Sequence, residues 1–149
     1  MQVRFANRQD EPNIRAFVES VYAESGGTFD LEGSDSDLRN IDAQYFGHEG
    51  LLIVVEEDKK ILGIAGARKK SESVLEIKRF LLDPSLHGDD TAGELIEIII
   101  SFAPRLLYHK IVDGRIGVQL SSTELAEALR KAGFTKENGT LSLSVQPDF

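Results

Sequence analysis

The sequence predicts an α/β fold built on one mixed sheet, and three observations support this prediction. Short alternating or β-rich apolar runs recur along the chain, for example at 3–5 and 51–55. Between them lie longer segments whose apolar residues follow the spacing of one helical face. Clusters of Gly, Pro, Asn, Asp and Ser separate the two kinds of segment. Read in order, the segments give β-α-α-β-β-β-α-β-α-β-β in a single domain, residues 1–149.

The first part of the chain supplies one strand and two helices. A strand at 3–5 precedes a helix that Asp10 can cap, with Pro12 in its first turn. A loop rich in Gly, Ser and Asp, at 24–36, leads to a second helix that we expect to start near Asp35.

The middle of the chain is predicted to form three strands and a buried helix. Two β-rich runs within 51–67 flank the charged segment EEDKK and read as an antiparallel hairpin. A third strand, at 73–84, ends at Pro84. The helix from Thr91 to Ala103 is apolar on more than one side, so neighbours should cover two of its faces.

The last third is predicted to contain a strand, a helix and a hairpin. The strand covers 110–120, and the pair Ser121 and Glu124 has the pattern of a capping box at the start of the helix. Gly133 should end this helix. Asn138-Gly139 is the preferred two-residue turn of a hairpin, and its terminal strand offers an edge that can pair across a homodimer.

Composition excludes several classes of function. The chain has no Cys, which rules out disulfides, thiolate zinc sites and a Cys nucleophile, and agrees with a cytoplasmic location. The N-terminus lacks the apolar core of a signal peptide, and the longest apolar run is too short for a membrane span. The formal net charge of −8 argues against nucleic-acid binding, because phosphate contacts need a basic face. This charge would attract a cationic amine, or it serves solubility alone.

The segment EIKRFLLDPSLHGDDTAGELI, residues 76–96, carries the main functional signal. It reads as a strand, a loop with Gly88, and a helix start, where unpaired N–H groups and the helix dipole favour a phosphate. It resembles the acetyl-CoA-binding motif of the GCN5-related N-acetyltransferase (GNAT) superfamily. The residues in register with that motif are Glu76, Lys78, Arg79, Pro84, Gly88, Ala92 and Leu95. Weaker similarities at 35–46, 62–67 and 127–134 occur in the family's order, so the resemblance covers essentially the whole chain.

This resemblance implies a GNAT fold, with a mostly antiparallel central sheet of six to seven strands flanked by about four helices. It also implies transfer of an acetyl group from acetyl-CoA to a primary amine of a small molecule or peptide by direct attack. Glu76 takes the place of the general base, which a protonated amine needs before it can attack. We expect no metal, because His48, His87 and His109 lack metal-ligand spacing. The residues expected to bind acetyl-CoA are Phe80, Leu81, Leu82, His87, Gly88, Asp89, Asp90, Thr91, Ala92, Gly93 and Ser122.

The sequence departs from the family pattern at four positions. His87 replaces an Arg or Gln, Asp90 a Gly, Ser122 an Asn, and Leu129 the Tyr that serves as general acid. A carboxylate about 4 Å from a phosphate costs roughly 4 kcal/mol at an effective dielectric near 20. If the carboxylate points to solvent, its repulsion of the phosphate lowers the binding free energy by only about 1 kcal/mol or less. Alternatively, Asp90 or Thr91 caps the helix, with Thr91 and Glu94 as a capping box.

Each candidate has a competing structural interpretation. Glu76 can be half of a Glu–Lys pair on a solvated strand face that, by alternation, also carries Lys78, Phe80 and Leu82. Tyr108 is expected to be a core residue with a satisfied hydroxyl rather than a replacement acid. A further group of side chains can either receive a cationic amine or lie solvated on a loop and helix: Asp30, Asp35, Asp37, Asp42 and Tyr45. The alternative function is a GNAT-fold binding or regulatory module with weakened or lost catalysis, and a third reading keeps acyl transfer with another acyl-CoA.

Overall fold

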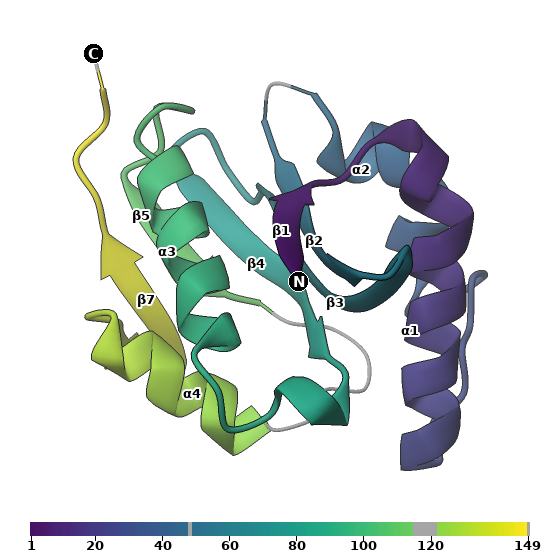
Figure 1. Ribbon diagram of the computed structural model, residues 1–149. Helices are drawn as coiled ribbons and strands as arrows, with labels where there is room; N and C mark the ends of the chain where they lie inside the picture. Colours follow the sequence, from purple (N-terminus) through teal and green to yellow (C-terminus); the bar gives the residue numbers. More distant parts are fainter. Residues whose placement is uncertain (48, 115–121, 149) are drawn as a thin grey trace.

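The computed structural model describes residues 1–47, 49–114 and 122–148, and its main feature is a seven-stranded sheet in the order β1-β2-β3-β4-β5-β7-β6 (Figure 1). All neighbouring strands are antiparallel except β4 and β5, which run parallel. The strands are β1 Gln2–Phe5, β2 Leu51–Glu57, β3 Lys60–Lys69, β4 Val74–Leu82, β5 Lys110–Asp113, β6 Thr135–Glu137 and β7 Thr140–Ser144. The predicted fold class, element order and mostly antiparallel sheet are confirmed.

Helices cover both faces of this sheet. On one side α1 (Glu11–Ser25) and α2 (Ile41–Tyr45) pack on β2, β3 and β4 around Leu52, Ile64 and Leu81. On the other side α3 (Thr91–Phe102) and α4 (Ser122–Lys131) enclose a second apolar core with Ile53 and Ile77 (Figure 1). Within the described residues, the helices are too short or too polar to cross a membrane.

Local signals explain most element boundaries. Asn138 and Gly139 have φ angles of 52° and 82°, as a two-residue hairpin turn requires, and Gly133 ends α4 with φ of 107°. Of the strand expected at 110–120, the described part is β5, and residues 115–120 lie outside the described part of the chain. Ser121 of the expected capping box lies outside it too, as does the side chain of its partner Glu124.

Two boundary predictions were wrong. Asp10 occupies the N-cap position of α1 but its side chain caps nothing there, because Arg4 holds it through two hydrogen bonds of 2.9 Å. The second helix begins at Ile41 rather than near Asp35. Only a short 3₁₀ turn, Ser36–Leu38, occupies the earlier position.

A β-bulge at Lys78 sets the geometry of β4. In its register with β3, Ile77 is opposite Ala67 and Arg79 is opposite Gly66, so Lys78 is the extra residue. Alternation therefore changes phase along β4: Ile77 and Phe80 both face the α3 core, whereas Leu81 faces α1. The predicted common face of Glu76, Phe80 and Leu82 was wrong for this reason.

Candidate functional site

The candidate site begins where β4 and β5 part. The two strands pair over Val74–Ile77 and Lys110–Asp113, and the last contact is a 2.9 Å hydrogen bond from Gly114 N to Ile77 O. Beyond that point, none of the described residues pairs with the β5 side of β4. Among the described residues, the C-terminal half of β4 therefore has a partner strand only on its β3 side.

Alternation identifies the backbone groups that β4 directs away from β3. Asp83 N donates to Leu62 O at 2.7 Å across β3, so the groups of Leu81, two residues earlier, also point toward β3. Those of Phe80 and Leu82 point toward the parting instead. Two of the three strand residues expected to bind the cofactor therefore direct their backbone to it, and Leu81 does not.

A short loop connects β4 to α3. Asp83 accepts a 3.0 Å hydrogen bond from Ser85 N, which shapes the turn Pro84–Leu86. His87 Nε2 lies 3.1 Å from Leu82 O, so this side chain turns back to β4. Gly88 has φ of 87°, a left-handed conformation that glycine adopts without strain.

The start of α3 is capped by Asp89, a residue expected to bind acetyl-CoA rather than to cap the helix. Asp89 Oδ1 accepts a 2.9 Å hydrogen bond from Thr91 N, while the exposed side chain of Asp90, the N-cap residue, caps nothing. The predicted capping by Asp90 or Thr91 was wrong. The amides of Ala92 and Gly93 are in the first turn, where no intrahelical acceptor exists.

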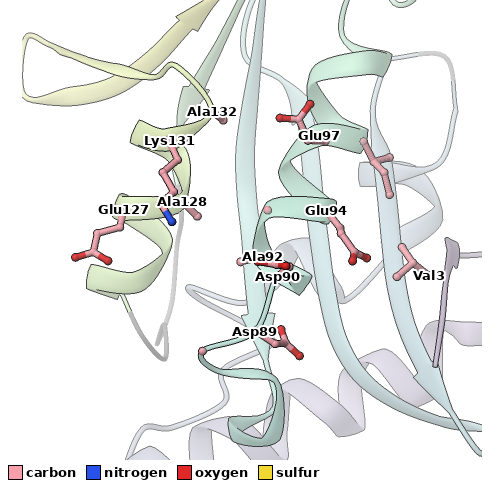
Figure 2. A pocket seen from close by; sticks show the side chains of 13 residues that line it. Val3, Asp89, Asp90, Ala92, Glu94, Glu97, Glu127, Ala128, Lys131 and Ala132 are labelled. Atoms are coloured by element: carbon pink, nitrogen blue, oxygen red, sulfur yellow. The ribbon is translucent and has the colours of Figure 1, made fainter.

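A groove of about 790 Å³ surrounds this helix start, with α4 on one side of α3 and Val3 of β1 on the other (Figure 2). Figure 2 shows Asp89, Asp90 and Glu94 at its α3 end, with Glu127 and Lys131 on α4. With Glu97, five carboxylates line the groove against one lysine. Small side chains, among them those of Ala92, Ala128 and Ala132, complete its wall. The groove is therefore roomy and strongly acidic.

Glu76 lies at the same parting but opens to the opposite face of the sheet. It lines a second pocket of about 790 Å³ beside α2, and its side chain is 13% exposed. Its carboxylate contacts Lys78 Nζ at 3.1 Å and Lys70 Nζ at 3.8 Å, which partly matches the Glu–Lys pair of the competing interpretation. A Cβ at Gly114 would lie 2.2 Å from Glu76 Oε2, so this glycine makes room for the carboxylate.

The acidic residues expected at an amine pocket instead form a buried ion cluster. Arg79, fully buried, donates from Nε to Asp37 Oδ2 at 2.9 Å and contacts Asp35 Oδ1 at 3.0 Å. Tyr22 donates its hydroxyl proton to Asp35 at 2.7 Å, and Tyr45 donates to Asp37. Neither predicted role, an amine receptor or a solvated acid, describes Asp35, Asp37 and Tyr45.

The cluster shifts the acidity of its members. Burial alone would raise the pKa of Asp37, but hydrogen bonds from Arg79 and the charge of Arg79 outweigh burial and hold this pKa below its usual value. Burial, followed by the charge of Asp37, raises the pKa of Tyr45. The other two acids of the group lie nearer the surface: Asp42 pairs with Arg8 at 3.0 Å, and Asp30 accepts a hydrogen bond from Glu32 N.

The remaining candidates behave as follows. Leu129 is fully buried in the α3 core, so the position of the family Tyr holds an apolar core residue. Tyr108 is buried and donates to Glu49 O at 2.6 Å, as expected for a satisfied core tyrosine. Ser122 is the first residue of α4, and its side chain lies outside the described part of the structure. Among the described residues, no cluster of His, Asp and Glu is arranged to hold a metal ion.

Sequence reasoning missed two residues of this site. Gly114 carried only the weak signal of a glycine inside a predicted strand. Arg68 carried no local signal, because its position opposite Glu76 appears only once β3 and β4 are paired in their bulged register.

No protein-family model matches this sequence, and a search of curated proteins finds no match. Solved structures with the same architecture do exist. A GNAT-family acetyltransferase from Staphylococcus aureus is 14% identical with a TM-score of 0.80, covering 97% of this chain and 99% of that chain.

Two further structures extend this likeness. A GNAT-family acetyltransferase from Brucella melitensis, in complex with acetyl-CoA, is 19% identical with a TM-score of 0.70 over 99% of this chain and 90% of its own. A chimera of spermidine N-acetyltransferase from Vibrio cholerae is 17% identical with a TM-score of 0.63, over 97% and 96% of the two chains. At these identities the likeness shows a shared fold.

Proposed function

We propose that this chain, which has the fold of the GNAT acetyltransferases, is an N-acetyltransferase that moves an acetyl group from acetyl-CoA to the amine of a small molecule or peptide by direct attack. One observation carries the proposal. Phe80, Leu82 and the carboxylate Glu76 all lie on β4 where β4 and β5 part, and one short loop leads from this strand to the N-terminus of α3.

The neutral part of acetyl-CoA fits the residues present. Its pantetheine arm carries amides, which can pair with the backbone N–H and C=O of Phe80 and with the N–H of Leu82, whereas Leu82 O already lies 3.1 Å from His87 Nε2. The alanines that line the groove leave space for a slender chain. The free amides of Ala92 and Gly93 point along the helix dipole toward the position of a diphosphate.

The charged part of acetyl-CoA, its phosphate groups, fits the groove less well than the neutral part does. Asp89 already occupies the amide of Thr91, and five carboxylates surround one lysine in the groove. Exposed carboxylates are screened, so each costs about 1 kcal/mol or less against a phosphate at moderate salt. The groove therefore admits acetyl-CoA with low affinity, and the acyl and pantetheine part supplies most of the binding.

When bound, acetyl-CoA supplies the thioester whose C–S bond breaks. Glu76 accepts one proton from the acceptor ammonium, and the freed nitrogen forms the new C–N bond. In this proposal the amide N–H of Phe80 or Leu82 stabilises the oxyanion that develops on the carbonyl. The electron pair of the C–S bond leaves on sulfur, which takes its proton from the attacking nitrogen or water, since Leu129 offers none.

A thermal-shift titration with acetyl-CoA tests the binding step. Ligand at 100 times its Kd adds about 2.7 kcal/mol of stability. For a domain of this size that corresponds to a rise in Tm of about 5–11 °C. No rise at millimolar acetyl-CoA would overturn the proposal.

Kinetics of Glu76→Gln test the base. Loss of a general base costs about 10²–10⁴-fold in rate, and acetyl-CoA binding should persist. Glu72→Gln is the matched control, because Glu72 is a highly exposed carboxylate paired with a lysine at 2.6 Å outside the pocket. A wild-type rate in Glu76→Gln would refute its role.

A second function, ligand binding without efficient turnover, is favoured by the acidic groove and by Leu129 at the acid position. The same experiments separate the two. Acetyl-CoA binding with no acetylation of any amine tried would support the binding module, and turnover that depends on Glu76 would support the enzyme.

A further inference from the structure

We infer that the amine acceptor also carries a carboxylate, a few atoms from its amine, and that Arg68 binds this carboxylate. The inference rests on the proposed function, because it assigns the pocket beside Glu76 to the acceptor. It adds a negative group to the acceptor, whereas the net charge of the chain indicated only a cationic amine or a role in solubility.

The charge of this pocket is opposite to that of the whole protein. Four cations line it, Arg68, Lys69, Lys70 and Lys78, together with two carboxylates, Glu49 and Glu76. The lining therefore has an excess of two positive charges, in a chain whose formal net charge is −8. Asp35 and Asp37 of the neighbouring loop are buried and paired with Arg79; the charge of Arg68 also acts on Asp37, but more weakly than that of Arg79.

Most of these cations already have carboxylate partners. Lys69 pairs with Glu49 at 3.0 Å and with Glu72 at 2.6 Å. Lys78 and Lys70 both pair with Glu76. Arg68 differs: its guanidinium donates to the neutral side chain of Gln44, and among the described residues no carboxylate lies within ion-pair distance of it. Arg68 is the cation of this pocket with capacity for an anion.

Arg68 and Glu76 are positioned to bind both ends of an amino acid. The register of β3 and β4 places them directly opposite each other on adjacent strands. Opposite residues of an antiparallel pair have Cβ atoms about 4.5–5.5 Å apart. In spite of this, the two side chains diverge, Arg68 toward Gln44 on α2 and Glu76 toward Lys78.

The divergence leaves opposite charges on the two sides of one pocket, a pattern that complements a zwitterion. The ammonium would lie at Glu76, where the proposed reaction removes its proton. The carboxylate would lie at Arg68, whose planar guanidinium can hold both carboxylate oxygens. An amine without an acidic group would leave Arg68 unmatched.

Matched acceptors test this inference. L-Glutamine, its α-amide, and its decarboxylated amine offer the same side chain with and without the α-carboxylate, and thiol release reports turnover. The wild type should have a KM about 10–100-fold lower for the acid than for the two neutral-end analogues, as a charge-assisted hydrogen-bonded pair provides. Equal KM values, or a preference for the decarboxylated amine, would overturn the inference and leave the proposed function intact.

Variants assign the effect to Arg68. Arg68→Gln should raise KM for the acid by the same factor and leave KM for the α-amide unchanged. Arg39→Gln is the matched control, an exposed arginine paired with Glu32 away from the pocket, and should change neither. A uniform loss for all acceptors in Arg68→Gln would refute the assignment.

A binding measurement separates this inference from the proposed function. If no amine is acetylated, the proposed function fails. The inference would still be supported if calorimetry shows that the wild type binds the amino acid but not its α-amide, and that Arg68→Gln no longer binds the amino acid. If the wild type binds neither compound, the inference is refuted.

Discussion

Replacing Arg79 by Met should destabilise the protein strongly, because it removes the only cation from a buried cluster of acids among the described residues. Arg79 and Asp35 are fully inaccessible, and Asp37 is nearly so. The guanidinium contacts both carboxylates and also donates to Tyr22 OH at 2.9 Å. The variant would leave two buried carboxylates that keep the hydrogen bonds from Tyr22 and Tyr45 but lose the compensating positive charge.

Breaking one partner out of a buried ion pair costs about 3–5 kcal/mol, since the remaining charge is uncompensated. For a chain of this length this corresponds to a fall in Tm of about 6–20 °C. Chemical denaturation followed by circular dichroism measures the free energy of unfolding, and calorimetry measures Tm. A loss below about 1 kcal/mol would refute the argument that the cluster depends on its cation.

Two further variants serve as a control and as a substitute for Arg79→Met. Glu137→Gln breaks the Lys110–Glu137 pair, whose carboxylate is 55% exposed, and should hardly change stability, because solvent screens this pair. If Arg79→Met fails to fold, Asp37→Asn retains the shape of the side chain and tests the same cluster. The double variant should lose less than the sum of the single losses, because the two residues share one network.

Three further predictions concern acidity and the site. Asp37 has a pKa below its ordinary 3.8, so its ionised form contributes fully to stability above about pH 4. This contribution disappears as the pH falls through the lowered pKa. The stability of Asp37→Asn should therefore depend less on pH in that range than the stability of the wild type, as acid unfolding measures. Gly114→Ala puts a methyl group against the Glu76 carboxylate, and displacing this carboxylate by about 1 Å can lower turnover about 10²-fold. In the Glu76→Gln background the same substitution should lower turnover no further. Additive losses in the double variant would contradict the idea that Gly114 acts through Glu76. Asp90→Gly and Asp90→Asn should each strengthen acetyl-CoA binding up to about fivefold, because each removes a carboxylate near the diphosphate. Added salt should strengthen binding to the wild type by screening the same repulsion. Unchanged affinity in both variants would mean that Asp90 faces away from the phosphates.

Local chemistry allowed the sequence to predict the order of elements. Asn138-Gly139 and Gly133 occupy positions that need positive φ, and the apolar spacing of α1 and α3 reflects burial on the expected faces. Such features depend on neighbours a few residues away. A single sequence therefore contains enough information to place them.

The predictions that were wrong concern residues whose position depends on partners far away in the sequence or on another strand. Asp37 is 42 residues from Arg79, and nothing near Asp37 indicates that a buried guanidinium will reach it. The cap of α3 was a competition between adjacent aspartates, in which Asp89 rather than Asp90 reaches the amide of Thr91. The side of the sheet on which each residue of β4 lies was also missed, because a bulge is a property of two paired strands.

The bulge at Lys78 has a consequence for how this protein tolerates change. Substituting Lys78 alters one side chain at the rim of a pocket. Deleting it would join Ile77 directly to Arg79 in a regular register with Ala67 and Gly66, so Arg79 would still face Asp35 and Asp37 and Phe80 would still face the α3 core. Deleting Phe80 would instead turn Leu81 toward α3. In a scan of deletions, β4 should therefore tolerate the loss of residue 78 better than the loss of Phe80, because only the extra residue can be removed without changing the side of the sheet on which its neighbours lie.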